Sequence, residues 1–293
     1  MPSHIYNRIK ELGSNFNPGI VQEIYELYKP LLRNAPKSNI KIINNIFYGE
    51  NKRQCFDMFY SSKNEGKKLP AIIYIHGGGF TQGHKNAIPE EPDLIHGNIA
   101  TFFARNNFIG INATYRLAPK YKWPSGKEDI KKIIEFIHIN SEKYRIDKDS
   151  IFLFGQSAGA SHVASYIFDE KINLDEYPIA GSILFSGVYD LLSMPSGPVK
   201  EYYGEDSNNF FEMSSKNFVK FSEIPLLIST CEFDPQLFKD QAIQLKTILE
   251  NLKKNYKFIQ IPNHNHLSQV IHLNTEDTAV SNDLIYFINK FRK

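Results

Sequence analysis

The sequence predicts an α/β protein built on a mostly parallel central sheet, and three features support this prediction. The first is a set of short apolar runs bounded by Gly and Pro, typical of strands buried on both faces, at residues 71–75, 108–113, 151–154, 179–185, 225–230 and 257–261. The second is a set of helix-length segments between these runs, at residues 93–106, 126–140, 158–168, 235–251 and 281–291. The third is the alternation of the two types, which favours parallel strands flanked by helices.

The remaining segments complete this architecture. The spacing of apolar residues predicts helices over 5–12 and 18–32, which we expect to form an N-terminal helical cover over about residues 1–35. Extended runs at 40–47 and 54–60, separated by a Tyr-Gly-Glu-Asn turn, predict a β-hairpin and raise the expected number of strands to about eight. The stretch 191–221 is rich in Ser, Gly, Pro and aromatic residues and is too long for an ordinary connection, so it predicts a cap or lid.

Length and composition bear on domain organisation. The 293 residues allow two average domains or one large α/β domain. No fixed-period repeat and no low-complexity linker divides the chain, and the candidate site residues described below extend from position 76 to position 266. We therefore expect one domain over residues 1–293.

Charge and hydropathy exclude several classes of protein. The 34 Lys and Arg residues nearly balance the 32 Asp and Glu residues and are scattered, which argues against a nucleic-acid partner. No stretch reaches the roughly 18 apolar residues of a membrane span, and the first residues lack an apolar leader region. Cys55 and Cys231 are too isolated for a disulfide framework or a Cys-rich zinc site. These features predict a soluble, cytoplasmic protein with a small-molecule partner.

A possible nucleophile lies between a predicted strand and a predicted helix. Residues 155–160 read Gly-Gln-Ser-Ala-Gly-Ala, which matches the G-x-S-x-G pattern of a nucleophile elbow in the context that such an elbow requires. A sharp turn of this kind exposes the hydroxyl of Ser157, and Gly on either side lets strand and helix approach closely. An accidental Gly/Ser turn is the alternative, but it does not account for the strand-to-helix context.

A glycine-rich loop follows the run 71–75. Residues 76–80 read His-Gly-Gly-Gly-Phe, at the C-terminal end of a predicted buried strand, where ligands bind in open α/β sheets. Consecutive glycines can direct N–H groups at one point, so Gly77, Gly78 and the N–H of Ala158 are the predicted oxyanion hole. A phosphate-binding loop is the rival interpretation, but neither G-K-S/T nor G-x-G-x-x-G is present.

A serine nucleophile requires a histidine base and a carboxylate that orients it, in the chain order Ser, acid, His for this type of elbow. Asp234 follows the run 225–230 and precedes Pro235, so we predict it as the acid, with Glu232 as the second candidate. Asp234 could also be no more than a helix N-cap. The base should be His264 or His266, in the loop after the last predicted strand.

The two histidines of the His264-Asn265-His266 segment could also be two ligands of a metal site. No third and fourth ligand follows with a metal-like spacing, so we expect no metal and no cofactor. The other histidines, including His162, His96, His138 and His272, are expected to be surface or packing residues.

Together these motifs resemble those of α/β-hydrolase fold esterases of the hormone-sensitive-lipase-like and feruloyl-esterase-like carboxylesterase group. The resemblance extends over most of the chain and includes the residues around Tyr48 and Arg53, the glycine loop, the elbow, and the segments Tyr-Arg-Leu-Ala-Pro at 115–119, Glu-Phe-Asp-Pro at 232–235 and His-Asn-His at 264–266. The usual elbow of this family reads Gly-Asp-Ser-Ala-Gly-Gly, whereas Gln156 and Ala160 stand at two of those positions here.

The resemblance implies an α/β-hydrolase fold and a serine carboxylic-ester hydrolase. It assigns Ser157 as the nucleophile, Asp234 as the acid and His266, rather than His264, as the base. His76 is expected to anchor its loop rather than to react. The residues that could line an apolar acyl or alcohol pocket are Phe80, Tyr202, Tyr203, Phe210, Phe211 and His264, although the aromatic ones could equally fill a small core within the cap.

Two alternatives remain. Kynurenine formamidase, an arylformamidase, is similar in its His-Gly-Gly loop and in the Ala that closes the elbow, at position 160 here, but it typically has an aromatic pair where this chain has Gly79 and Phe80. The substrate is therefore expected to be a small ester or a formamide. The second alternative is a hydrolase fold used as a non-catalytic ligand receptor.

Overall fold

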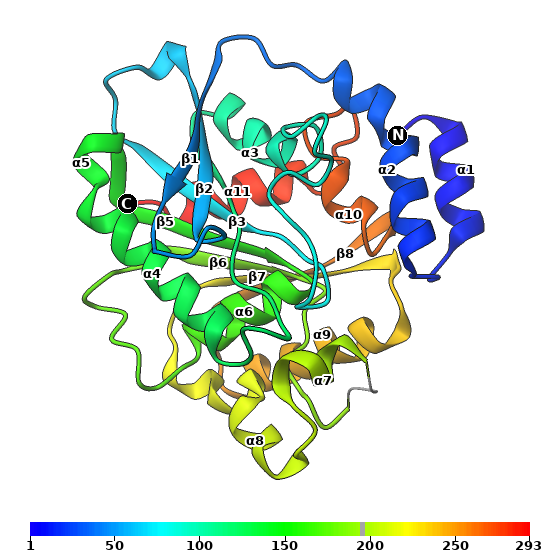
Figure 1. Ribbon diagram of the computed structural model, residues 1–293, viewed down its shortest axis with the longest axis vertical. Coiled ribbons are helices and arrows are strands. Elements are labelled where there is room, and N and C mark those ends of the chain that lie inside the picture. The colour runs from blue at the N-terminus through cyan, green and yellow to red at the C-terminus, as the bar shows by residue number, and fades with distance from the viewer. Residues whose placement is uncertain (194–196) are drawn as a thin grey trace.

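The computed structural model describes residues 1–193 and 197–293, whose strands form one eight-stranded sheet (Figure 1). The strands lie in the order β1-β2-β4-β3-β5-β6-β7-β8, and their bounds are β1 (Ile40–Phe47), β2 (Cys55–Ser61), β3 (Leu69–Ile75), β4 (Ile109–Ala113), β5 (Ile146–Gln156), β6 (Gly181–Phe185), β7 (Leu226–Phe233) and β8 (Tyr256–Asn265). β2 is antiparallel to both of its neighbours, and the strands from β4 to β8 are parallel. The predicted mostly parallel sheet and the N-terminal hairpin are confirmed.

The continuously apolar strands follow from the burial of both sheet faces. Successive side chains of a strand point to opposite faces, so Ile73 of β3 joins one hydrophobic core and Tyr74 joins the other. On β5, Leu153 and Phe154 divide in the same way. Neither face can therefore be polar, which explains why the runs lack the alternation of a half-exposed strand.

Helices cover each face of the sheet (Figure 1). One face packs against α4 (Ser125–Ile139), α6 (Ala158–Ile167) and α9 (Gln236–Asn251), and the other packs against α3 (His96–Arg105), α11 (Ser281–Phe291), α1 (Ser3–Leu12) and α2 (Pro18–Arg33). α2 begins where the sequence predicts, because Pro18 opens it and the side chain of Asn17 accepts a hydrogen bond from Ile20 N–H at 3.1 Å.

The short helices lie in the connections. α5 (Ser141–Tyr144) and the 3-10 helix η1 (Ser62–Asn64) lie in turns, and α10 (Ser268–Ile271) follows β8. The predicted cap, 191–221, contains α7 (Pro198–Tyr203), η2 (Ser207–Asn209), α8 (Phe210–Met213) and η3 (Ser215–Phe221), while its residues 194–196 lie outside the described residues. None of the helices in the described part of the chain is both long and apolar enough to cross a membrane.

Candidate active site

Strand register brings the predicted site residues to one edge of the sheet. Phe233 of β7 pairs with Asn265 of β8. The next residue of each strand, Asp234 and His266, therefore leaves the sheet beside the other. Gln156 of β5 pairs in the same way with Phe185 of β6, and Ser157 leaves the sheet there. Both strands of the β7–β8 pair continue beyond their predicted ends, and this extension carries the acid and the histidine to the serine.

Ser157 occupies a strained turn between β5 and α6. Its backbone has φ 55° and ψ −123°, in a region that residues with a side chain rarely adopt, and its N–H donates to Phe185 C=O at 2.8 Å. A Cβ atom on Gly159 would lie 2.1 Å from the carbonyl oxygen of Ile75, and one on Gly155 would lie 2.5 Å from the Ala160 backbone. Both glycines are therefore required by the close approach of α6 to the sheet.

A chain of hydrogen bonds joins Ser157, His266 and Asp234. His266 Nδ1 lies 2.7 Å from Asp234 Oδ1, and His266 Nε2 lies 2.9 Å from Ser157 Oγ. Because a carboxylate only accepts hydrogen bonds, Nδ1 carries the proton and Nε2 of the neutral ring accepts from the serine hydroxyl. This is the arrangement that a serine nucleophile and its base require.

Buried donors surround the carboxylate of Asp234. The hydroxyls of Ser186 and Thr230 both donate to Oδ2, and so does Cys231 N–H at 3.3 Å. Burial alone would raise the pKa of Asp234, but its electrostatic interaction and hydrogen bond with His266, together with the hydrogen bonds from the Ser186 and Thr230 hydroxyls, outweigh burial and lower the pKa. Asp234 is thus held as a carboxylate.

The His266 ring is fixed by rings and by its backbone. Phe238 of α9 stacks on it with centroids 4.2 Å apart, and Phe16, from the α1–α2 turn, meets it edge-on at 5.0 Å. Gln156 Nε2 and Gln269 Nε2 each donate to the carbonyl of His266 at 2.9 Å. The side chain of Gln156 also lies beneath the glycine loop, because a Cβ on Gly77 would be 2.4 Å from Gln156 Oε1.

The loop with the glycines approaches the serine. A Cβ on Gly77 would lie 3.1 Å from the Cβ of Ser157, and Gly78 has φ 130°. Among the described residues, neither Gly77 nor Gly78 donates its N–H to another backbone group, and Ala158 is the first residue of α6, where N–H groups have no partner within the helix. These three N–H groups are available for a ligand oxygen.

His76 serves as an anchor of this loop. Its ring is fully buried, bonds to Gly77 C=O at 2.6 Å, and stacks on Tyr115, whose hydroxyl donates to the His76 carbonyl at 2.9 Å. Burial lowers the pKa of His76 well below its usual range, so the ring is neutral.

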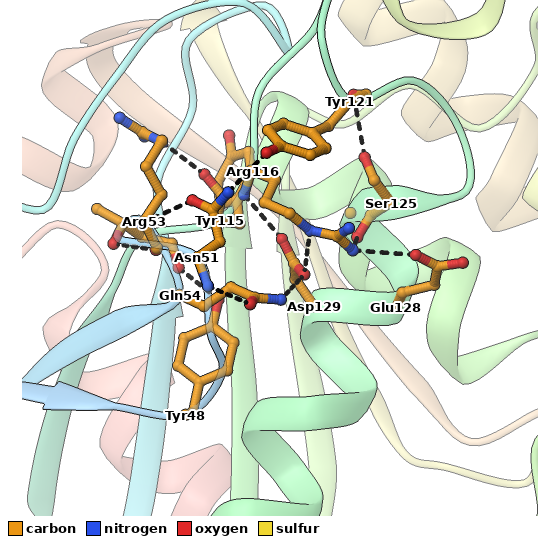
Figure 2. A network of polar contacts seen from close by, with 12 residues as sticks. Tyr48, Asn51, Arg53, Gln54, Tyr115, Arg116, Tyr121, Ser125, Glu128 and Asp129 are labelled. Carbon is orange, nitrogen blue, oxygen red and sulfur yellow. Dashed lines mark hydrogen bonds and ion pairs between the residues drawn. The ribbon is translucent and has the colours of Figure 1, made fainter.

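A polar network holds the neighbouring segment that carries Tyr115 (Figure 2). Arg53 Nε donates to the carbonyl of Tyr115 at 2.7 Å, and Arg116 Nε donates to Asp129 Oδ1 at 2.8 Å. Gln54 Nε2 donates to the same carboxylate at 2.7 Å. The residues around Arg53 and Tyr115 therefore fix, through Tyr115, the loop that carries the glycines.

The predicted pocket residues other than His264 lie in two separate places. Phe80, Tyr202 and Tyr203 are buried against one another beside Ala158, with Phe80 stacked on Tyr202 at 5.0 Å, and Phe210 packs against this cluster. These aromatic residues pack the glycine loop against α7, as expected if they fill a small core rather than line a pocket. Phe211 is 62% exposed and lines a separate surface pocket of about 290 Å³ beside Trp123 and Phe168.

His264 does not join Ser157, although it lies two residues from His266. Its ring is fully buried and contacts Ser268, His272 and Asp277. It therefore does not line the expected acyl pocket. Residues two apart in an extended strand share a face, but β8 ends at Asn265, so His266 has already left the strand and its ring has different neighbours from that of His264.

Sequence reasoning did not single out several residues that support the site: Gln156 as a bridge, Ser186, Thr230, Phe238 and Gln269. Ser186 could have been found, because it follows the strand next to the elbow and its position matches that of Ser157 in the parallel register. The contribution of Phe238 depends on the orientation of α9, which the sequence does not encode locally.

An eight-stranded sheet of this order, with an elbow serine, a histidine and an aspartate at one edge, defines the α/β-hydrolase fold. Comparison with known proteins agrees. The BD-FAE family model matches residues 56–249, and the chain belongs to the BD-FAE family. The predicted resemblance to α/β-hydrolase esterases is confirmed.

The individual relatives share only about a quarter to a third of their residues with this chain over the matched segments. Tabersonine synthase of Catharanthus roseus is 26% identical over 193 residues, which cover 59% of this chain and 58% of that protein. Probable carboxylesterase 1 of Arabidopsis thaliana is 31% identical over 130 residues, which cover 41% of this chain and 39% of that protein. The chain thus spans less than two thirds of the length of these curated relatives. The solved structure of esterase B from Lactobacillus rhamnosis has the same fold, with a TM-score of 0.76, 16% identity and coverage of 98% of this chain and 95% of that chain.

Proposed function

We propose that the protein is a serine carboxylic-ester hydrolase that acts on small to medium acyl esters. The observation that carries the proposal is the hydrogen-bonded chain from Ser157 Oγ through His266 to Asp234, beside the loop of Gly77 and Gly78, whose N–H groups donate to no backbone group among the described residues. Membership in the BD-FAE family and similarity to a carboxylesterase support it.

The first half of the reaction forms an acyl-enzyme. Ser157 Oγ attacks the ester carbonyl while His266 Nε2 takes its proton, and Asp234 stabilises the imidazolium that results. Negative charge then develops on the carbonyl oxygen and is bound by the N–H groups of Gly77, Gly78 and Ala158. His266 returns the proton to the leaving alcohol as the bond to it breaks.

The second half releases the acid. Water attacks the acyl-enzyme, His266 accepts a proton from that water, and the proton passes back to Ser157 Oγ as the carboxylic acid leaves. Water is the co-substrate that balances the atoms, since it supplies both the hydroxyl of the acid and the proton regained by the serine.

The test is turnover of short p-nitrophenyl esters by the wild type and by Ser157→Ala. We expect the variant to lose at least about 1,000-fold in kcat, because removal of the nucleophile leaves only the contribution of the oxyanion hole and of binding. An unchanged rate in Ser157→Ala would refute the proposal.

A formamidase of the kynurenine formamidase type is the second candidate, because the same residues would cleave a formamide and Ala160 matches its elbow. Comparison of kcat/KM for N-formylkynurenine and for a p-nitrophenyl butyrate ester separates the two. A higher value for the ester supports the esterase, and a higher value for the formamide supports the formamidase. Inactivity on both, together with an unreactive Ser157, supports the non-catalytic alternative.

A further inference from the structure

A second cluster of titratable side chains lies at the end of β8 and around α10. Figure 1 shows where these two elements lie. It consists of His264 at the end of β8, His272 just after α10, and Asp277 in the loop before α11. One ligand atom of each residue lies within 4.8 Å of those of the other two. None of the three belongs to the hydrogen-bonded chain of Ser157.

The two imidazole rings are buried with unused nitrogens. Both rings are 0% exposed, and among the described residues Nε2 of His264 and Nε2 of His272 have no hydrogen-bond partner. A buried polar atom without a partner destabilises the folded state, so two of them beside one carboxylate require an explanation.

The other nitrogen of each ring is fixed. His272 Nδ1 lies 2.8 Å from the carbonyl of Ser268, which can only accept, so Nδ1 carries the proton and Nε2 of the neutral ring presents a lone pair. His264 Nδ1 lies 3.0 Å from the hydroxyl of Ser268, which also accepts from Asn265 N–H. Metal-binding histidines are oriented in this way, with one nitrogen held by a carbonyl or hydroxyl and the other left for the metal.

A hydrogen bond alone accounts for only part of the cluster. If His264 Nε2–H faced Asp277 Oδ2, 3.4 Å away, the lone pair of His272 would still lack a donor. A cation satisfies all three groups. The 3.4 Å separation is also close to the edge of a tetrahedron with metal–ligand bonds of about 2.0–2.1 Å, for which that edge is about 3.3–3.4 Å.

We propose that His264 Nε2, His272 Nε2 and Asp277 Oδ2 bind a divalent transition-metal ion of the zinc class. Two imidazoles and one carboxylate suit Zn²⁺ and leave one tetrahedral position open. The α-amino group of Met1 lies 3.6 Å from Asp277 Oδ2, and an entering cation displaces this ammonium group. The two rings are stacked, with centroids 4.1 Å apart and an interplanar angle of 25°, so one ring has to turn for both Nε2 lone pairs to point at the same ion.

The ion would tie together three segments on either side of His266. It would join the end of β8, the end of α10 and the loop before α11. The first two are otherwise connected here through Ser268. The proposed role is to cross-link these segments, and it does not depend on the proposed esterase activity. Sequence spacing alone did not reveal this site, because His264 lies beside His272 and not beside His266, two residues further along the chain.

The test measures binding of Zn²⁺ to untagged, folded protein. After dialysis against Zn²⁺ and removal of free metal, we expect one Zn²⁺ per chain by elemental analysis, and Co²⁺ in its place should give the visible absorption of a tetrahedral site. His272→Gln and Asp277→Asn should each weaken Zn²⁺ affinity at least about 100-fold. His138→Gln is the matched control, because His138 is a half-buried histidine whose Nε2 lies 3.0 Å from Pro178 C=O, and it should bind like the wild type.

Circular dichroism shows whether each variant is folded. Because the stoichiometry and the Co²⁺ spectrum are measured on the wild type, they remain decisive if a variant does not fold. Absence of stoichiometric Zn²⁺ from the folded wild type would overturn the proposal, as would equal affinity in the folded wild type, His272→Gln and Asp277→Asn. Loss of ester hydrolysis with retained Zn²⁺ binding would count against the proposed function alone.

Discussion

His264 lies in the last part of β8 and His266 directly follows this strand, yet their surroundings give the two histidines different chemistry. His266 lies between a carboxylate and a hydroxyl, and two glutamine side chains and the ring of Phe238 hold it. His264 faces the opposite way, towards His272 and Asp277. The family resemblance favours His266 as the base, and the hydrogen bonds of the folded chain support the same choice.

Paired variants separate the two histidines. We expect His266→Ala to lower kcat for p-nitrophenyl esters by about 10,000-fold or more, because the serine then lacks its base. We expect His264→Gln to keep kcat within about tenfold and to lower the thermal unfolding midpoint, because a buried residue is changed away from the serine. Steady-state rates and thermal melts of both variants provide the measurement, and the reverse pattern of activities would contradict the assignment.

At the scale of elements, the elbow depends on how closely α6 approaches β3. A Cβ on Gly159 would lie 2.1 Å from the backbone oxygen of Ile75, and a backbone atom cannot move aside as a flexible side chain can. The position of Ser157 at the end of β5 is therefore coupled to the packing of the whole helix.

Gly159→Ala should lower the free energy of unfolding by about 1–3 kcal/mol or more, because the new methyl group forces α6 away from the sheet. Urea unfolding measures this change. Gly19→Ala is the control, since the added atom would meet only the exposed side chain of Asn17, at 3.2 Å, and the free energy should change by less than about 1 kcal/mol. Equal, small effects at both positions would show that the close approach is not limiting.

The elements that the sequence predicts best are those whose signal is local. The strands were expected from apolar runs, and β1 (Ile40–Phe47) has its expected bounds. The extension of β7 and β8 to Phe233 and Asn265 was not expected, because it includes polar residues such as Glu232 and Asn265, and the register shifts between Cys231 and Phe233 before Phe233 pairs with Asn265. The short helices α7, α8 and α10 have fewer than two turns and depend on tertiary packing, so their sequences carry little signal of their own.

The candidate site shows the same limit. Ser157, Asp234 and the glycine loop follow predicted strands, so their types and positions could be predicted from the sequence. Ser186 contacts both Asp234, which is 48 residues away in the sequence, and Gln269. These contacts depend on the register of the parallel strands and on the path of the loop after β8, which no local sequence pattern encodes. The cluster of His264, His272 and Asp277 likewise forms only because the chain around α10 brings His272 and Asp277 next to the end of β8.

At the scale of the whole molecule, buried neutral histidines couple stability to pH. Burial lowers the pKa of His96 to about 4, that of His162 to about 3 and that of His76 well below its usual value. Below about pH 6.5 the unfolded chain binds protons at these positions while the folded chain does not. Their contribution to stability is therefore complete above about pH 6.5 and is lost as the pH falls towards the folded pKa values.

We expect the free energy of unfolding to decrease from pH 7 to pH 5, with a slope of up to about 1.4 kcal/mol per pH unit for each such histidine. The lowered pKa of Asp234 acts in the same direction at still lower pH, whereas burial raises the pKa of Asp129 and opposes it. Urea unfolding at several pH values measures the slope, and His162→Gln should flatten it. Stability that is constant or higher at pH 5 would contradict this expectation.

The reactivity of Ser157 is the property that the proposed function most depends on. The direct measurement is labelling of the folded protein by a fluorophosphonate probe, followed by peptide mapping of the adduct. We expect a single adduct on Ser157, absent from urea-unfolded protein and formed at least about 1,000-fold more slowly in His266→Ala, because a serine hydroxyl reacts only when a base removes its proton. An unlabelled folded protein, or an adduct elsewhere with Ser157 unmodified, would contradict the account.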